Sequence, residues 1–135
     1  MAFRKFITES GKEVIAGKSA ETNEELIKQI EGKSIILHTK EKGSPFAEIK
    51  QKKGEKISKK DIYEAGVFCS VYSQDWKKNK KDVIMHIFSG KDIFKDGKMK
   101  AGTFGVKDAK AMRIKKEDIE NFQGKLFNDL RESLS

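Results

Sequence analysis

A short block in the first half of the chain combines residue types that hold phosphate groups. His38 ends an apolar stretch, the tight turn Gly43-Ser44-Pro45 follows it, and Lys50 ends the next apolar stretch. Such a turn can direct the backbone N–H groups of Gly43 and Ser44 at an anion, and a histidine carries a charge that changes near neutral pH. These residues predict phosphate binding rather than hydrolysis.

Three lysines in other segments extend this candidate site. Lys18 follows a glycine before a predicted helix, and Lys91 and Lys95 lie four residues apart later in the chain. Each lysine taken singly reads as a solvated surface residue, whereas the group favours a binding face. Equally open are a bracing role for His38 at its strand end and a plain strand connection for the Gly43-Ser44-Pro45 turn.

The sequence has no recognisable arrangement of catalytic residues. His38 and His86 are the only histidines, Cys69 is the only cysteine, and no nucleophile, phosphate-loop or metal-spaced motif occurs. We therefore expect a protein that is not an enzyme and that uses neither a metal nor another cofactor. Cys69 lies on an apolar stripe and is expected to be an inert packing residue.

Positive charge is concentrated in the middle of the chain. Residues 50–116 carry 19 basic and 8 acidic groups, whereas the whole chain of 135 residues has a net charge of +8. Such asymmetry is typical of proteins that bind polyanions. Lysine supplies 26 of the 29 basic residues, which favours contact with phosphates over bidentate reading of bases. The alternative is a lysine-rich, solvated surface.

Periodicity predicts an α+β fold with a mixed β-sheet, two packing helices and a C-terminal amphipathic helix. Ser19 is expected to cap a helix that ends near Ile30, and Ser58 with Asp61 to begin a second helix that continues past Trp76. Trp76, beside a lysine run, is expected to be the most exposed aromatic residue of that helix. Strands are predicted over residues 3–8, 14–16, 34–39, 46–49, 83–88, 93–94, 103–106 and 111–114.

The last 19 residues form a separate acidic segment. We expect a domain over residues 1–116 and a helical extension over 117–135, where Ile119, Phe122, Leu126 and Leu130 make an apolar stripe. The stripe most simply packs on the domain itself, and a homodimer or a protein partner is the alternative. No apolar run is long enough for a membrane span and no signal peptide precedes the first strand, so the cytoplasm is the expected compartment.

The order of these blocks resembles the RNA-binding (R) domain of the NFACT family. The matching elements are a glycine-led hairpin at Gly11, the turn at Gly17-Lys18-Ser19, the strand ending at His38, the turn at Gly43, and a helix ending in Tyr72-Ser73-Gln74-Asp75-Trp76. Ser34 and Lys18 stand where the family often has Asp and Arg. The resemblance covers roughly residues 3–115.

The resemblance implies an RNA-binding module with tRNA or ribosomal RNA as partner, in contact with the large ribosomal subunit. It also implies RNA contacts at Lys18, His38, Gly43, Ser44, Lys50, Lys91 and Lys95. Two other functions stay open. One is a protein-interaction adaptor acting through residues 117–135, and the other is an accessory subunit of an RNA-modification system.

Overall fold

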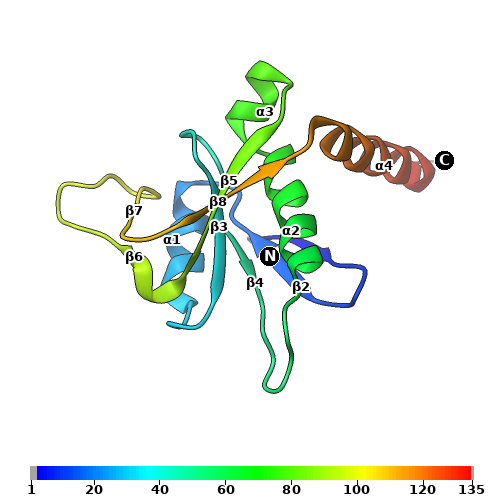
Figure 1. Cartoon of the computed structure of the whole chain (residues 1–135). Helices are drawn as coiled ribbons and strands as arrows, with labels where there is room; N and C mark the ends of the chain where they lie inside the picture. The colour runs from blue at the N-terminus through cyan, green and yellow to red at the C-terminus, as the bar shows by residue number, and fades with distance from the viewer. Residues whose placement is uncertain (1–2, 135) are drawn as a thin grey trace.

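A six-stranded antiparallel sheet organises the chain, whose residues 3–134 are described by a computed structural model (Figure 1). Two further strands, β6 (Ile93–Phe94) and β7 (Gly105–Val106), form a small hairpin at one side. In spatial order the sheet consists of β1 (Arg4–Ile7), β2 (Glu13–Ala16), β4 (Ala47–Ile49), β3 (Ile35–Thr39), β5 (Val83–Ser89) and β8 (Lys110–Ile114).

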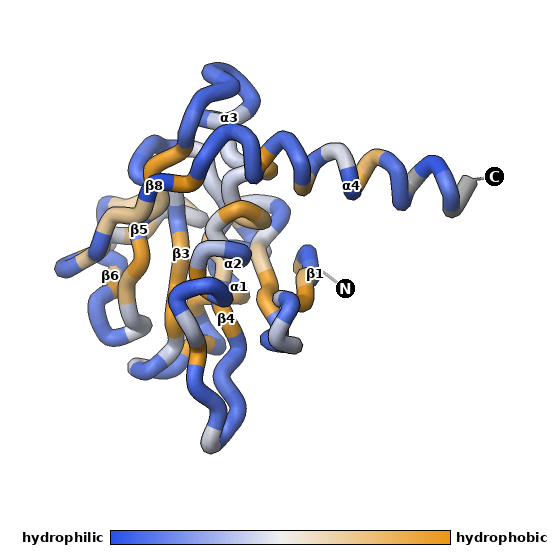
Figure 2. Tube along the Cα trace, turned by 45° about the vertical axis from the view of Figure 1, so that its right-hand side comes forward, coloured by the Kyte–Doolittle hydropathy of each residue, from blue (hydrophilic) through white to orange (hydrophobic). Residues whose placement is uncertain are grey.

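One face of the sheet is buried under helix α2 (Lys59–Val71). The strands present apolar side chains to it at alternate positions, as a half-buried sheet requires. These strand residues join Ala65, Phe68 and Cys69 of α2 in the larger core. Gly66 allows close approach, because an added Cβ there would lie 2.7 Å from Ile114 Cδ1. Apolar residues of the strands and of α2 are visible in Figure 2.

Helix α1 (Ala20–Gln29) covers only part of the opposite face. Leu26 packs there with Ile15, Ile36 and Phe88 in a second, smaller core. Residues 93–106, which we call the flap and which contain β6 and β7, pack against this smaller core through Ile93, Phe104 and Val106 and leave part of the face open. Figure 1 shows the flap extending from the side of the sheet.

The predicted α+β fold is confirmed, but the prediction of a mixed sheet was wrong. The connection through α1 does join two strands that run in the same direction, β2 and β3. Strand β4 lies between them and pairs antiparallel with both. Every pairing among the described residues is therefore antiparallel.

Both predicted helix starts are present, whereas the second helix ends earlier than expected. Ser19 and Ser58 each form a capping box. Helix α2 stops at Val71, and Ser73 begins a separate helix, α3 (Gln74–Asn79), by accepting a hydrogen bond from the Trp76 amide. This break turns the Trp76 ring into the core, where it is only 1% exposed, so its predicted exposure was wrong.

Helix α4 (Lys116–Leu134) begins on the core and then extends beyond it (Figure 1). Ile119 is fully buried, and Phe122 packs against Phe6 and Phe68. Leu126 and Phe127 are exposed, and the side chain of Leu130 lies outside the described part of the structure. The stripe thus packs on the domain in its first half. Among residues 3–134, no helix is both long and apolar enough to cross a membrane.

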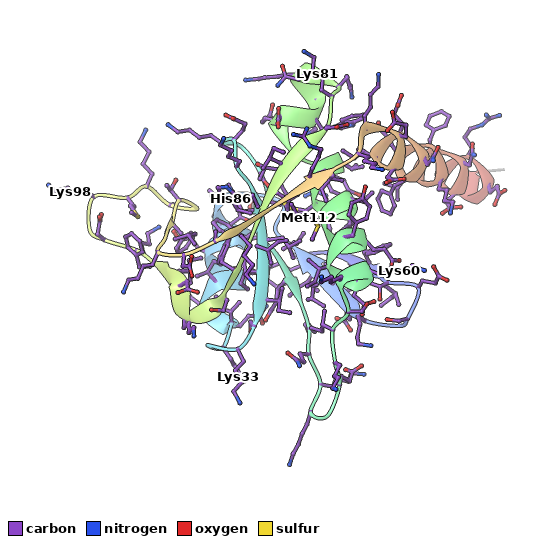
Figure 3. The ribbon with its side chains drawn as sticks, in the orientation of Figure 1. Lys33, Lys60, Lys81, His86, Lys98 and Met112 are labelled. Atoms are coloured by element: carbon purple, nitrogen blue, oxygen red, sulfur yellow. The ribbon has the colours of Figure 1, made fainter. Side chains whose placement is uncertain are left out.

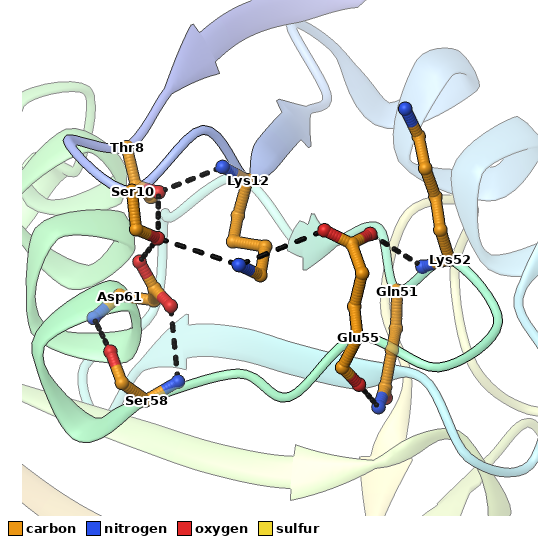
Figure 4. Close-up of polar contacts among 8 residues, drawn as sticks. All are labelled: Thr8, Ser10, Lys12, Gln51, Lys52, Glu55, Ser58 and Asp61. Atoms are coloured by element: carbon orange, nitrogen blue, oxygen red, sulfur yellow. Dashed lines mark hydrogen bonds and ion pairs between the residues drawn. The ribbon is translucent and has the colours of Figure 1, made fainter.

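A buried carboxylate fixes the start of α2 to the β1–β2 turn (Figure 4). Asp61 accepts hydrogen bonds from the Ser10 hydroxyl at 2.6 Å and from the Ser58 amide at 3.0 Å, and Lys12 pairs with Glu55 at 3.7 Å. Burial alone would raise the pKa of Asp61, but the hydrogen bonds from Ser10, Ser58 and Thr8 hold that pKa well below its ordinary value.

Replacing Asp61 with Asn should destabilise the domain. The amide cannot accept both hydrogen bonds, so we expect D61N to lower the free energy of unfolding by about 1–3 kcal/mol at pH 7. The folded-state pKa lies below the unfolded value of about 3.9, so this stabilisation is present above that value and is lost as the pH falls. Urea denaturation should therefore show a smaller deficit at pH 3 than at pH 7.

The matched control is Asp108→Asn, which removes an exposed carboxylate. It should leave the unfolding midpoint within error at both pH values. Equal stability of D61N and the wild type at pH 7 would contradict the role given to Asp61.

Candidate functional site

A hollow of about 900 Å³ opens on the sheet face that α1 leaves uncovered. His38 of β3 and His86 of β5 lie on its floor as cross-strand neighbours. Its walls come from five segments: Arg4 of β1, residues 17–23 at the start of α1, the turn 42–46, the junction of α2 with α3, and flap residues 98–106. We call this feature the basic hollow.

The lining of the basic hollow is strongly cationic. No Asp or Glu lines it, so its interior repels cations and attracts anions. Arg4 is already engaged, since its Nη1 donates to the Gly17 carbonyl at 3.0 Å and its guanidinium lies 4.1 Å from the Tyr72 ring centroid. The basic side chains on the lining are Arg4, Lys18, Lys42, Lys77, Lys98 and Lys100.

The five lysines of this set are exposed, and none is in an ion pair with another described residue. We call them the rim lysines. Figure 3 shows Lys98 reaching out from the flap, while Lys33, Lys60 and Lys81 lie at separate edges of the molecule. Positive charge is thus distributed widely, and at the basic hollow it surrounds a concave surface that has no carboxylate in its lining.

The two histidines differ in their surroundings. His38 Nδ1 donates to the Thr39 carbonyl at 2.7 Å, and the His38 ring centroid lies 4.4 Å from that of Phe46. Burial lowers the pKa of His38, and the neighbouring His86 lowers it further, although the bond to Thr39 acts in the opposite direction. The lowered pKa favours the neutral form of His38 at pH 7, so the positive charge of the hollow does not depend on this ring and is supplied by Arg4 and the lysines of the lining.

The Gly43-Ser44-Pro45 turn is built tightly into the wall. Gly43 has φ +84°, and an added Cβ there would lie 2.6 Å from Gln74 Cγ. Its carbonyl accepts a hydrogen bond from the Gln74 amide at 2.8 Å. The Ser44 hydroxyl points inward, donating to the Pro45 carbonyl and accepting from the Thr39 amide. The Ser44 side chain therefore braces the turn, and anion binding by its backbone amide stays a prediction.

The structure brings together four of the seven predicted site residues. Lys18, His38, Gly43 and Ser44 line the basic hollow. The other three lie outside it: Lys50 pairs with Glu13 at 3.5 Å, Lys91 lies beside Gly32, and Lys95 binds Glu24. RNA contact by any of the seven stays a prediction.

Sequence reasoning missed most of the rim lysines. Lys77 belongs to the lysine run over residues 77–81, beside Trp76. Lys98 and Lys100 lie in a loop that contains glycine. These segments are distant in the sequence, and only the fold brings their lysines together with Lys18 and Lys42 at the rim of the basic hollow.

Glu24 holds the flap against α1. Its Oε1 accepts hydrogen bonds from Lys95 Nζ and, at 2.8 Å, from the Gly102 amide. Those bonds, led by the one from Lys95, lower the pKa of Glu24. Gly102 has φ +77°, and an added Cβ would lie 2.7 Å from Ala20 Cα. Lys95 is therefore a structural residue that helps to place Lys98 and Lys100 at the hollow.

The single cysteine of the chain is poorly placed for nucleophilic chemistry. Cys69 is buried, and burial raises the pKa of its thiol to about 12. Within residues 3–134, no three His, Cys, Asp or Glu side chains are grouped to hold a metal ion.

The sequence matches a known family of RNA-binding domains. The model of a family described as NFACT protein RNA binding domain matches residues 2–108. No curated protein shows significant sequence similarity to the chain.

Solved structures with the same fold include one that matches most of this chain. It is the C-terminal region of the fibronectin/fibrinogen-binding protein from Streptococcus suis, with a TM-score of 0.76 and 16% identity over 90% of this chain. The chain spans 49% of that structure's length, and at this identity the likeness concerns the fold alone.

Removing the Glu24 carboxylate should release the flap. We expect Glu24→Ala to speed amide hydrogen exchange in residues 95–106 and to leave exchange in α2 unchanged, because the lost hydrogen bonds are local. Glu25→Ala, which alters an exposed neighbour on the same helix, is the matched control. Equal exchange of the flap in both variants would show that Glu24 does not hold it.

Proposed function

The chain belongs to the NFACT protein RNA binding domain family, and from that premise we propose that its basic hollow binds structured RNA of the tRNA or ribosomal RNA class. The protein acts in this proposal as a binding module without catalytic activity. It works in the cytoplasm, in association with the large ribosomal subunit.

The observation that carries the proposal is the grouping of unpaired lysines around a carboxylate-free hollow. Each rim lysine that neutralises a phosphate releases condensed counterions, which gives sequence-independent affinity for nucleic acid. A lysine ammonium acts as a point charge and does not make the bidentate contacts by which arginine reads guanine. Recognition of RNA through phosphates and shape follows from this chemistry.

The two faces of the domain differ in charge, and this difference also contributes to where RNA binds. The acidic helix α4 packs against α2, on the sheet face away from α1. A polyanion is attracted to the lysine-rich face and repelled by the acidic one. RNA is therefore disfavoured at the face that α4 covers.

Simultaneous replacement of four rim lysines tests the site. We expect Lys18→Ala, Lys42→Ala, Lys98→Ala and Lys100→Ala together to weaken tRNA binding at least tenfold at about 0.1 M salt, measured by fluorescence anisotropy. The slope of log K against log salt should fall by roughly 0.9 for each lost phosphate contact on a duplex.

The control replaces four exposed lysines outside the hollow and makes the same change in net charge. It combines Lys33→Ala, Lys53→Ala, Lys81→Ala and Lys110→Ala. If the control weakens tRNA binding as much as the rim variant does, charge alone drives binding and the site assignment fails.

A second candidate function is favoured by apolar residues at the groove between β1 and α4. Leu126 lines this groove, Ile7 at its edge is 57% exposed, and the nearby Phe127 is 60% exposed. A protein partner, or a second copy of the chain, would cover these side chains. Under this alternative the protein is an adaptor that acts through residues 117–135.

Two charged substitutions separate the alternatives without removing the buried first half of α4. Leu126→Lys with Phe127→Lys should abolish self-association in sedimentation velocity if the groove is a dimer surface, and should leave tRNA affinity unchanged. A wild-type chain that is monomeric at all concentrations would contradict the dimer.

A further inference from the structure

The interior of the basic hollow differs chemically from its rim. Its floor and walls carry rings from His38, His86, Phe46 and Phe104. The Phe104 and Phe46 ring centroids are 5.4 Å apart and the two rings are perpendicular. Lys95 Nζ lies 4.5 Å from the centroid of the Phe104 ring, so this ring is held in place by the same lysine that ties the flap to Glu24.

A polar side chain is also left available inside the hollow. Asn23 is only 9% exposed and lines the hollow. Its Oδ1 accepts a hydrogen bond from the Phe46 amide at 3.2 Å, which fixes the orientation of the side-chain amide. Within the described residues, no hydrogen bond engages Asn23 Nδ2. Among the described residues the one fully buried side-chain polar atom without a hydrogen bond is Glu64 Oε2, so Asn23 Nδ2 is accessible from the hollow and can donate to an acceptor on a ligand.

We infer that the basic hollow receives one unpaired nucleobase of the RNA while the rim lysines hold the phosphates on either side of it. This inference rests on the proposed function. A volume of about 900 Å³ is within the range of pockets that enclose small ligands. Unpaired bases are recognised by stacking on aromatic side chains together with hydrogen bonds to their edges, and the rings and Asn23 supply both.

The positions of the aromatic rings and of the lysines indicate the chemical class of the ligand. Aromatic rings inside and cations outside fit a flat, apolar-faced group that is joined to anions, which describes a nucleotide within a chain. Every base has a π-face and at least one acceptor, so the hollow distinguishes an unpaired base from a paired one rather than one base from another. A base within a continuous duplex is already stacked and must be unstacked first, at a cost in affinity.

Three RNA hairpins of identical length test the inference on the unmodified protein. One hairpin is fully paired, one has a single bulged nucleotide, and one has an abasic residue at the bulge. We expect the bulged hairpin to bind roughly tenfold more tightly than either of the others, in keeping with the gain from stacking one base. A bulged 2-aminopurine should lose fluorescence on binding.

Phe104→Leu should reduce this preference for the bulged hairpin, since it keeps an apolar side chain but removes the aromatic face. Phe94→Leu is the matched control, because Phe94 is on the same flap, is 39% exposed and does not line the hollow. The control should retain the preference.

The outcomes separate the two proposals. Equal, salt-dependent affinity for all three hairpins would overturn the base pocket and leave the proposed function intact. The same holds if Phe104→Leu and Phe94→Leu behave alike. Binding of no hairpin at low salt would overturn both.

Discussion

A sheet with two apolar faces must be covered on both, and in this chain one face is covered incompletely. Helices α2 and α4 bury one face with a large core that includes Trp76 and Ile119. Helix α1 is only 10 residues long and buries the other face near Leu26 and Phe88. The part of that face around His38 and His86 is left as the floor of the basic hollow. The candidate binding surface is thus a consequence of unequal covering of the two faces.

The flap forms one wall of the hollow because the Glu24 carboxylate binds it at two points. Glu24 points away from the lining and binds Lys95 and the Gly102 amide, so its negative charge is neutralised where it holds the flap. Lys98 and Lys100, on the same flap, stay unpaired among the described residues and can interact with an external anion. Lys50 and Lys95 are engaged in ion pairs outside the lining, whereas Lys18 lines the hollow and is in no ion pair with another described residue. RNA contact by Lys18 stays a prediction.

Local features of the sequence were sufficient to predict most elements. Ser19 and Ser58 mark helix starts, because a capping side chain acts within its own turn. The antiparallel insertion of β4 depended on tertiary packing, and no local pattern indicated it. The break at Ser73 does have a local cause, a capping serine, but the helical spacing of apolar residues through Trp76 outweighed it in the prediction. Part of the candidate site could be predicted from the sequence, because His38 and Gly43 lie close together along the chain and both line the hollow. Glu24 and Lys95 are 71 positions apart, so their pairing became evident only in the fold.

The central claim is that RNA binds at the uncovered sheet face, and mapping backbone amides by NMR during a titration with tRNA tests it most directly. The account predicts that chemical-shift changes concentrate in residues 17–23, 42–46 and 98–106, which surround the basic hollow. Changes confined to α4, which packs on α2 at the opposite face of the sheet, would contradict it.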